Sequence, residues 1–106
     1  VQVLNECDDY HSSCGHLYYV SFIGIVAEYR NKFYNMMADH GVMCNVHFKP
    51  LPLLSAYSKR GFKITDYPNA YNMHKNQLTL PMNSTLTDDE AWYVIETFKQ
   101  CMKTLK

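Results

Sequence analysis

The sequence lacks the features that mark several special classes of protein. Its ten basic and ten acidic residues cancel, so the formal net charge is zero. No excess of positive charge therefore favours nucleic acid or an anionic membrane surface. The longest apolar run, residues 17–27, is interrupted by Ser21 and Gly24, and it is shorter than the roughly 20 residues that a membrane span needs. We expect neither a nucleic-acid partner nor a membrane partner.

Cysteine is also scarce, with four in 106 residues. Disulfide-held secreted domains are usually denser in cysteine, and the polar first fifteen residues show no secretory signal. Cys44 and Cys101 lie in apolar patterns that are typical of buried thiols. We therefore expect reduced thiols and a cytoplasmic protein. The alternative is a zinc site formed by the cysteines and histidines near the N-terminus: Cys7, His11, Cys14 and His16. The six residues between that cysteine pair exceed the usual spacing of zinc ligands.

The size and composition of the chain indicate one folded domain. A chain of 106 residues is too short for two ordinary domains. A hydrophobic content of 47% with no net charge argues against intrinsic disorder. The chain opens with Val1, and we expect it to be a piece of a longer protein.

Hydrophobic patterning predicts about three strands. Residues 16–23 are dense in aromatic and β-branched side chains, residues 42–48 alternate in polarity, and residues 78–80 form a short apolar stretch before Pro81. Residues 1–15 are mostly polar, and we expect them to form a loop or linker.

The sequence between the strands predicts helices of two lengths. Apolar residues recur at helical spacing over residues 28–40, and Gly41 follows at the position where glycine commonly ends a helix. Residues 53–60 predict a short helix, and another begins at Pro68, since proline fits the first turn of a helix.

The last helix, residues 88–105, has the clearest start. Thr87 and Glu90 form the spacing of a capping box, in which each side chain bonds the backbone N–H of the other. An apolar face follows, formed by Ala91, Val94, Ile95, Phe98, Cys101, Met102 and Leu105. Together these elements predict a small two-layer α+β domain. A mainly antiparallel sheet of about three strands packs on the two longer helices, with short helices in the middle.

The best candidate for a functional segment lies at the end of the second predicted strand. His47, Phe48 and Lys49 stand just before Pro50, at a strand end where scaffolds often present functional groups. Strand alternation predicts His47 and Lys49 on one face and Phe48 on the other. The pattern alone favours an ordinary hydrogen-bonded histidine and a solvated lysine. Tyr57 lies in the irregular middle of the chain, where it is available for ligand contact.

An ordered series of short motifs resembles the C-terminal part of one enzyme family. The motifs are His16-Leu17-Tyr18-Tyr19-Val20, His47-Phe48-Lys49-Pro50-Leu51-Pro52, Tyr67-Pro68-Asn69-Ala70, Leu78-Thr79-Leu80-Pro81-Met82 and Leu86-Thr87-Asp88-Asp89-Glu90. This series is similar to the DegT/DnrJ/StrS family of pyridoxal-phosphate-dependent aminotransferases, fold type I, which act on nucleotide-linked sugars. The chain departs from it at Pro52, where many members carry a second histidine.

The resemblance implies a role for the chain within a larger enzyme. Residues 16–106 would form the small C-terminal domain, and residues 1–15 would link it to a large domain that binds pyridoxal phosphate through a Schiff-base lysine. The implied activity transfers an amino group from an amino acid, commonly glutamate, to a keto sugar. His47, Phe48 and Lys49 would approach these substrates, and the full-length protein would be a homodimer.

The same resemblance implies that the fragment alone has no catalytic or cofactor-binding residue, and the ligand spacing leads us to expect no metal-binding residue either. A stand-alone, non-catalytic binding module on this scaffold is the alternative hypothesis.

Overall fold

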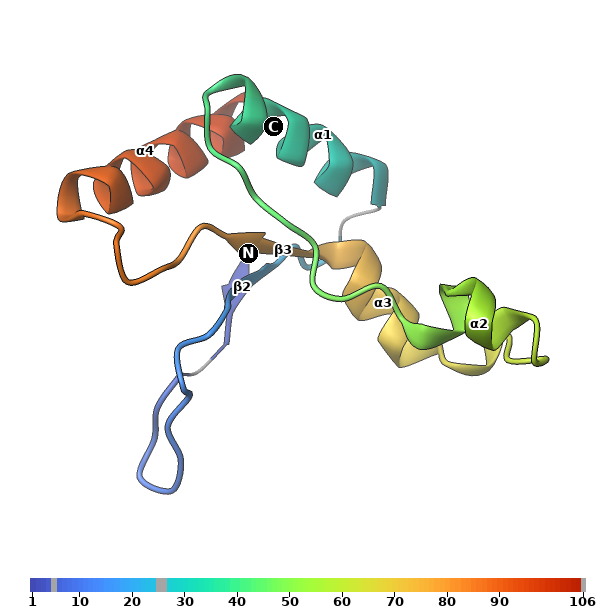
Figure 1. Cartoon of the computed structure of the whole chain (residues 1–106). Coiled ribbons are helices and arrows are strands. Elements are labelled where there is room, and N and C mark those ends of the chain that lie inside the picture. The colour runs from blue at the N-terminus through green and yellow to red at the C-terminus, as the bar shows by residue number, and fades with distance from the viewer. Residues whose placement is uncertain (5, 25–26, 106) are drawn as a thin grey trace.

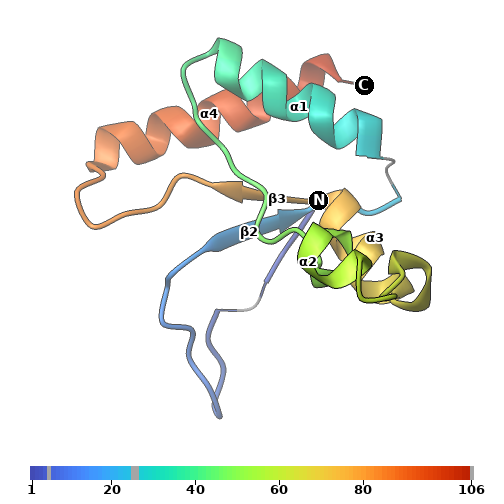
Figure 2. The same ribbon diagram turned by 45° about the vertical axis from the view of Figure 1, so that its right-hand side comes forward.

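The computed structural model describes residues 1–4, 6–24 and 27–105. Three strands, β1 (Gln2–Val3), β2 (Tyr18–Ser21) and β3 (Gln77–Leu80), form an antiparallel sheet in the order β1-β2-β3. Two long helices, α1 (Ala27–Asp39) and α4 (Asp88–Thr104), lie together over one face of the sheet (Figure 1, Figure 2). The predicted two-layer α+β fold is confirmed, with both long helices within a residue of their expected limits.

Short helical elements fill the middle of the chain, as the sequence predicts. They are the 3-10 turns η1 (Leu51–Leu53) and η2 (Ile64–Asp66) and the helices α2 (Ser55–Ser58) and α3 (Pro68–Asn76). Pro68 occupies the first turn of α3, where its missing N–H costs nothing. These elements lie at the end of the sheet away from the first turn of α4 (Figure 1, Figure 2).

The start of α4 has the expected capping box. The Glu90 backbone N–H donates to Thr87 Oγ1 at 3.3 Å, and Glu90 Oε2 accepts from the Thr87 backbone N–H at 2.8 Å. These bonds from Thr87 lower the pKa of the Glu90 carboxyl. The apolar face of α4 differs from expectation at Ile95, which is 40% exposed. Thr97, which the pattern did not place on this face, is buried.

The core joins the sheet to both long helices through three phenylalanines. Phe22, which follows β2, packs against Phe33 of α1 with ring centroids 5.1 Å apart. Phe33 meets Phe98 of α4 edge-on at 4.8 Å. Phe22 and Phe33 are fully buried, as are Met37 and Leu78. The sheet face and the two helices therefore share one continuous hydrophobic core.

The prediction of a strand over residues 42–48 is wrong. Only Asn45 pairs with the sheet, through two backbone hydrogen bonds to Thr79 of 2.8 and 2.9 Å. The Asn45 side chain accepts from the Val46 backbone N–H at 2.7 Å, which is a local bond that competes with ladder formation. The chain therefore touches the outer edge of β3 at one residue and then leaves it.

The third strand lies instead in the segment that was expected to be a loop or linker. Gln2 and Val3 pair with Ser21 and Val20 of β2. Residues 6–16 then form an arm that projects from the body of the molecule, with a bridge between Cys7 and Ser12 (Figure 1). A strand of two residues carries too little pattern to be recognised from sequence.

Candidate functional site

The structure brings His47, Phe48 and Lys49 together on one cleft of about 420 Å³. The expected alternation of faces is wrong here, because the segment is not a strand and all three side chains line the same hollow. The other walls include Tyr19 and Ser21 of β2 and residues of α3. The peptide bond between His47 and Phe48 is cis.

Each of the three side chains has a distinct environment. His47 is half-buried, and its Nδ1 lies 3.1 Å from the hydroxyl of Thr79, which fixes the ring against β3. The Phe48 ring packs edge-on against His47 with centroids 4.8 Å apart, yet it is 68% exposed. Lys49 is exposed at the same wall. The cleft thus offers an oriented imidazole, an open aromatic ring and a cation.

Tyr57 is not part of this cleft. It lies on α2, where its ring packs against Phe62 at a centroid distance of 6.1 Å, and it is 37% exposed. Its predicted contact with a substrate remains a prediction.

The sequence did not single out His74, in the last turn of α3, which lines the same cleft as the His47 segment. Its Nδ1 is buried and has no hydrogen-bond partner among the described residues. Burial lowers the pKa of His74, and the positive charges of Arg30 and Lys49 lower it further. The ring is therefore neutral near pH 7. No short motif marks this residue, because its environment comes from distant parts of the chain.

Arg30 of α1 holds the end of α3 against the rest of the domain. Its side chain is buried and donates to the carbonyls of His74 and Gln77 at 3.3 and 3.0 Å. A cation at the C-terminal end of a helix also complements the helix dipole. Burial lowers the pKa of Arg30, but a guanidinium stays charged at neutral pH. Arg30 therefore fixes the position of one wall of the cleft.

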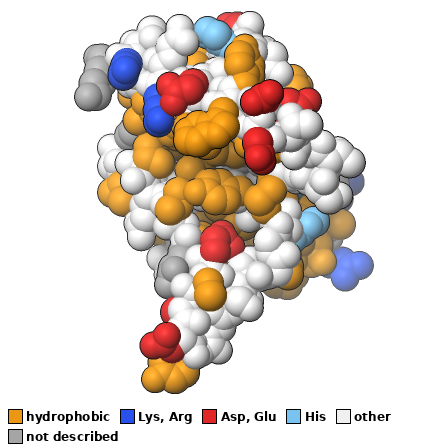
Figure 3. Space-filling view, turned by 90° about the vertical axis from the view of Figure 1, so that its left-hand side faces the viewer, with side chains coloured by type: hydrophobic (Ala, Val, Ile, Leu, Met, Phe, Trp, Pro, Cys, Tyr) orange, Lys and Arg blue, Asp and Glu red, His pale blue; other side chains and the backbone are white. Residues whose placement is uncertain are grey.

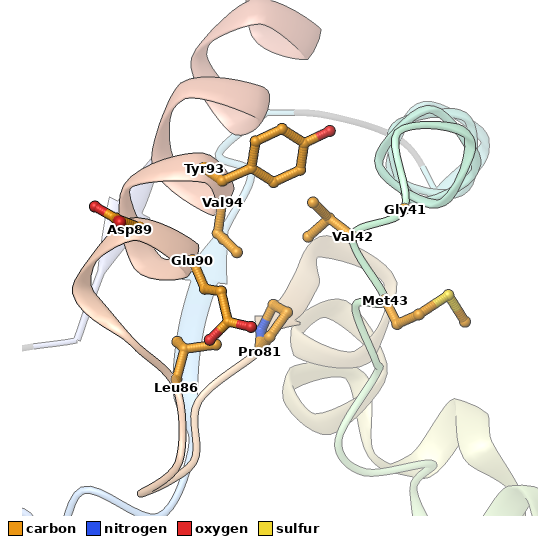
Figure 4. Close-up of a pocket in the computed structure, with 9 residues that line it drawn as sticks. All are labelled: Gly41, Val42, Met43, Pro81, Leu86, Asp89, Glu90, Tyr93 and Val94. Atoms are coloured by element: carbon orange, nitrogen blue, oxygen red, sulfur yellow. The ribbon is translucent and has the colours of Figure 1, made fainter.

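A second hollow, of about 470 Å³, lies between the start of α4 and the segment after α1. Figure 4 shows Tyr93 and Val94 of α4 on one side and Val42 on the other, with Asp89 pointing away. The Tyr93 hydroxyl donates to the His40 carbonyl at 2.8 Å, which ties α4 to the end of α1. With its carboxylates turned aside or bound in the helix cap, this hollow is mainly an apolar surface.

The cysteines divide into two pairs. Cys44 and Cys101 are buried and free, as expected, and burial together with neighbouring Cys101 raises the pKa of Cys44 to about 11. Cys7 and Cys14 are free and exposed on the arm. In the part of the chain that the structure describes, no three histidine, cysteine or acidic side chains come close enough to hold a metal ion. None of the described helices is long and apolar enough to cross a membrane.

Comparison with known proteins identifies the family of the chain. The model of the DegT/DnrJ/EryC1/StrS aminotransferase family matches residues 2–99. The spore coat polysaccharide biosynthesis protein SpsC of Bacillus subtilis is 35% identical over 66 residues, which are 61% of this chain and 17% of SpsC.

Solved structures match nearly the whole chain. Spr1654 from Streptococcus pneumoniae, assigned as a sugar aminotransferase and solved in its PMP form, superposes with a TM-score of 0.92 at 40% identity. The match covers 98% of this chain and 26% of Spr1654. The aminotransferase TlmJ from Streptoalloteichus hindustanus gives a TM-score of 0.84 at 25% identity, over 99% of this chain and 27% of TlmJ. The chain thus spans about a quarter or less of the length of these relatives, and it belongs to the DegT/DnrJ/EryC1/StrS aminotransferase family.

Proposed function

We propose that this chain is the C-terminal small domain of a pyridoxal-phosphate-dependent aminotransferase that transfers an amino group from glutamate to a nucleotide-linked keto sugar. Residues 16–106 form the domain, and residues 1–15 join it to the preceding domain, with β1 fastening that connection to the sheet. The observation that carries the proposal is the match of 98% of this chain to 26% of Spr1654 at a TM-score of 0.92.

The cleft is the surface through which the domain contacts substrate. Phe48 presents an open ring for apolar contact, and Lys49 presents a cation suited to the phosphates of a sugar nucleotide. His47, fixed by Thr79, provides an oriented polar group at the same wall. Tyr57 is a further proposed contact, from α2. These residues bind and orient substrate, and they do not take part in the bond-making and bond-breaking steps.

Pyridoxal phosphate supplies an electron sink when bound, and proteins hold it with a lysine and with a group facing the pyridine nitrogen. The residues of this cleft do not fit that group. Lys49 lines the cleft, but none of its described lining residues is acidic. We therefore assign the Schiff-base lysine and the pyridine partner to the large domain, and we expect the 106-residue chain alone to be inactive.

An apolar face of the molecule fits contact with that large domain. Figure 3 shows hydrophobic side chains gathered across this face around a hollow, with acidic side chains at its border. A further hollow, of about 290 Å³, lies between β3 and α4, beside the hollow at the start of α4. Large apolar side chains at these two hollows are exposed: Tyr18, Met43, Met82, Tyr93 and Ile95. Exposed apolar patches of this kind mark interaction sites. We assign the large domain of the same protein to this face, in a full-length homodimer.

The test uses the full-length protein with pyridoxal phosphate, glutamate and a nucleotide-linked keto sugar. We expect mass spectrometry to detect an amino sugar nucleotide and an equal amount of 2-oxoglutarate. Omission of glutamate should abolish both products. A full-length protein that binds the cofactor but forms neither product with any amino donor would refute the proposed function.

A further inference from the structure

We infer that His74 is a specificity-determining residue of the cleft, which donates a hydrogen bond from Nε2 to the diphosphate of the substrate beside Lys49. This inference rests on the proposed function and adds a residue and a ligand group to it. It starts from the unusual position of the His74 ring, which lines the cleft while one of its nitrogens is buried without a partner.

The surroundings of the ring decide which nitrogen carries the proton. A neutral imidazole has one N–H and one lone pair. A proton on Nδ1 would be buried with no acceptor among the described residues, which is costly. A lone pair on Nδ1 lies instead in the positive field of Arg30 and Lys49, the two cations that also lower the pKa of the ring. The proton therefore belongs on Nε2, and because Nδ1 is buried while the residue lines the cleft, we take Nε2 as the nitrogen that faces the ligand.

The charges around the cleft select an anion. Lys49 lines it together with His74, and no acidic side chain does so among its described lining residues. An ammonium and an N–H donor in one hollow match the oxygens of a diphosphate, to which charge-assisted hydrogen bonds are strong. The exposed Phe48 ring on the same wall offers a stacking surface for a base. A nucleoside diphosphate combines these two features in one ligand.

The position of His74 depends on the frame around it. The Arg30 guanidinium holds the His74 carbonyl at 3.3 Å and the Gln77 carbonyl at 3.0 Å, so the last turn of α3 is tied to α1. The Phe22 backbone N–H donates to the Asn76 carbonyl at 2.8 Å, which ties the same turn to the end of β2. The donor is thus held in place before the ligand arrives, which reduces the entropic cost of binding.

The experiment measures binding to the full-length protein by calorimetry with three probes: uridine diphosphate, inorganic pyrophosphate and uridine. His74→Leu should raise the Kd for uridine diphosphate about tenfold, the effect of one hydrogen bond to a charged group. His74→Gln keeps an N–H at a similar distance from the backbone and should stay within about threefold of the wild type. Uridine, which has no phosphate, should bind all three proteins equally.

Two lysine variants provide the matched control for charge. Lys49→Met should weaken both diphosphate probes, and the loss should shrink at high salt. Lys75→Met removes a cation from the same turn of α3 as His74, but that lysine lies over the Tyr71 ring and does not line the cleft. It should leave all three affinities unchanged. Because Lys49 is exposed, its variant tests the site even if His74→Leu does not fold.

The outcomes distinguish a free diphosphate from a nucleoside diphosphate as the ligand. They also distinguish failure of the role of His74 from failure of the proposed aminotransferase function. Equal losses for pyrophosphate and uridine diphosphate mean that the site recognises the anion alone. A loss with uridine diphosphate only would contradict the hydrogen bond, because pyrophosphate offers the same acceptor oxygens. An unchanged Kd for both in His74→Leu, or an equal loss for uridine, overturns the inference. The conversion of the bound cofactor by glutamate, followed by absorbance, is measured in parallel. If the wild type shows that conversion, failure of the binding result refutes only the role of His74.

Discussion

Replacement of Arg30 by methionine tests how the cleft wall is held in place. Methionine fills much of the same space and removes the guanidinium that donates to the carbonyls of His74 and Gln77. Hydrogen bonds that involve a charged group contribute about 1.5–3 kcal/mol each, and the 3.3 Å bond belongs at the weak end of that range. We therefore expect Arg30→Met to lower the free energy of unfolding by about 2–4 kcal/mol.

Urea denaturation of the chain, followed by tryptophan fluorescence and by circular dichroism, measures this loss. Arg60→Met is the matched control. Arg60 is exposed, and its side chain makes no hydrogen bond to any of the described residues. It should change stability by less than about 0.5 kcal/mol. A loss below about 1 kcal/mol in Arg30→Met, or a loss equal to that of the control, would refute the role assigned to Arg30.

Three further predictions concern the rest of the chain. Thr87→Ala should cost about 1 kcal/mol in urea denaturation at pH 7. Since the folded pKa of Glu90 is lowered, the stabilisation by this carboxylate is present above its unfolded pKa and is lost as the pH falls through the folded value. The wild type should therefore lose more stability than Thr87→Ala on acidification, and parallel pH profiles would argue against the cap. At pH 8, iodoacetamide should label Cys7 and Cys14 quickly and Cys44 slowly, because a pKa of about 11 leaves little thiolate; equal labelling rates by peptide mass spectrometry would count against the buried position. The 106-residue chain, treated with pyridoxal phosphate and borohydride, should carry no cofactor at a specific lysine after dialysis, and a stoichiometric adduct would contradict the assignment of that lysine to another domain.

Local signals allowed much of the fold to be predicted. The capping box at Thr87, the glycine at position 41 and the proline at position 68 each act within one turn of a helix, so their effects can be read from neighbouring residues. Gly41 has a φ of +77°, the left-handed conformation that ends α1. These three positions fix the helix limits without any knowledge of tertiary contacts.

The errors in the fold arose where pairing over long distances decided the structure. The alternating pattern of residues 42–48 indicates which side chains would share a face of a strand. It does not indicate how many residues at the edge of β3 can form backbone hydrogen bonds with this segment. Asn45 alone pairs with β3, at Thr79. The third strand, Gln2–Val3, gains its partner from β2, where the paired residues lie 17 and 19 positions further along the chain. Both outcomes depend on tertiary context, which overrides a short local pattern.

The candidate site was only partly visible in the sequence. The segment of His47, Phe48 and Lys49 was recognised, but its side chains share one cleft instead of two faces. Tyr57 lies outside that cleft. His74 was not singled out, because its buried nitrogen and its lowered pKa arise from Arg30 and Lys49, which only the folded chain brings near.

The rate of amino transfer by full-length Phe48→Ala tests the central claim, that this domain forms the sugar-binding wall of an aminotransferase. Phe48 is 68% exposed, so its removal should not disturb folding. We predict that kcat/KM for the sugar nucleotide falls about tenfold or more, as expected for the loss of a stacked aromatic contact. The rate of cofactor conversion by glutamate should stay within about twofold of the wild type. An unchanged kcat/KM for the sugar, or an equal fall in both rates, would contradict the account.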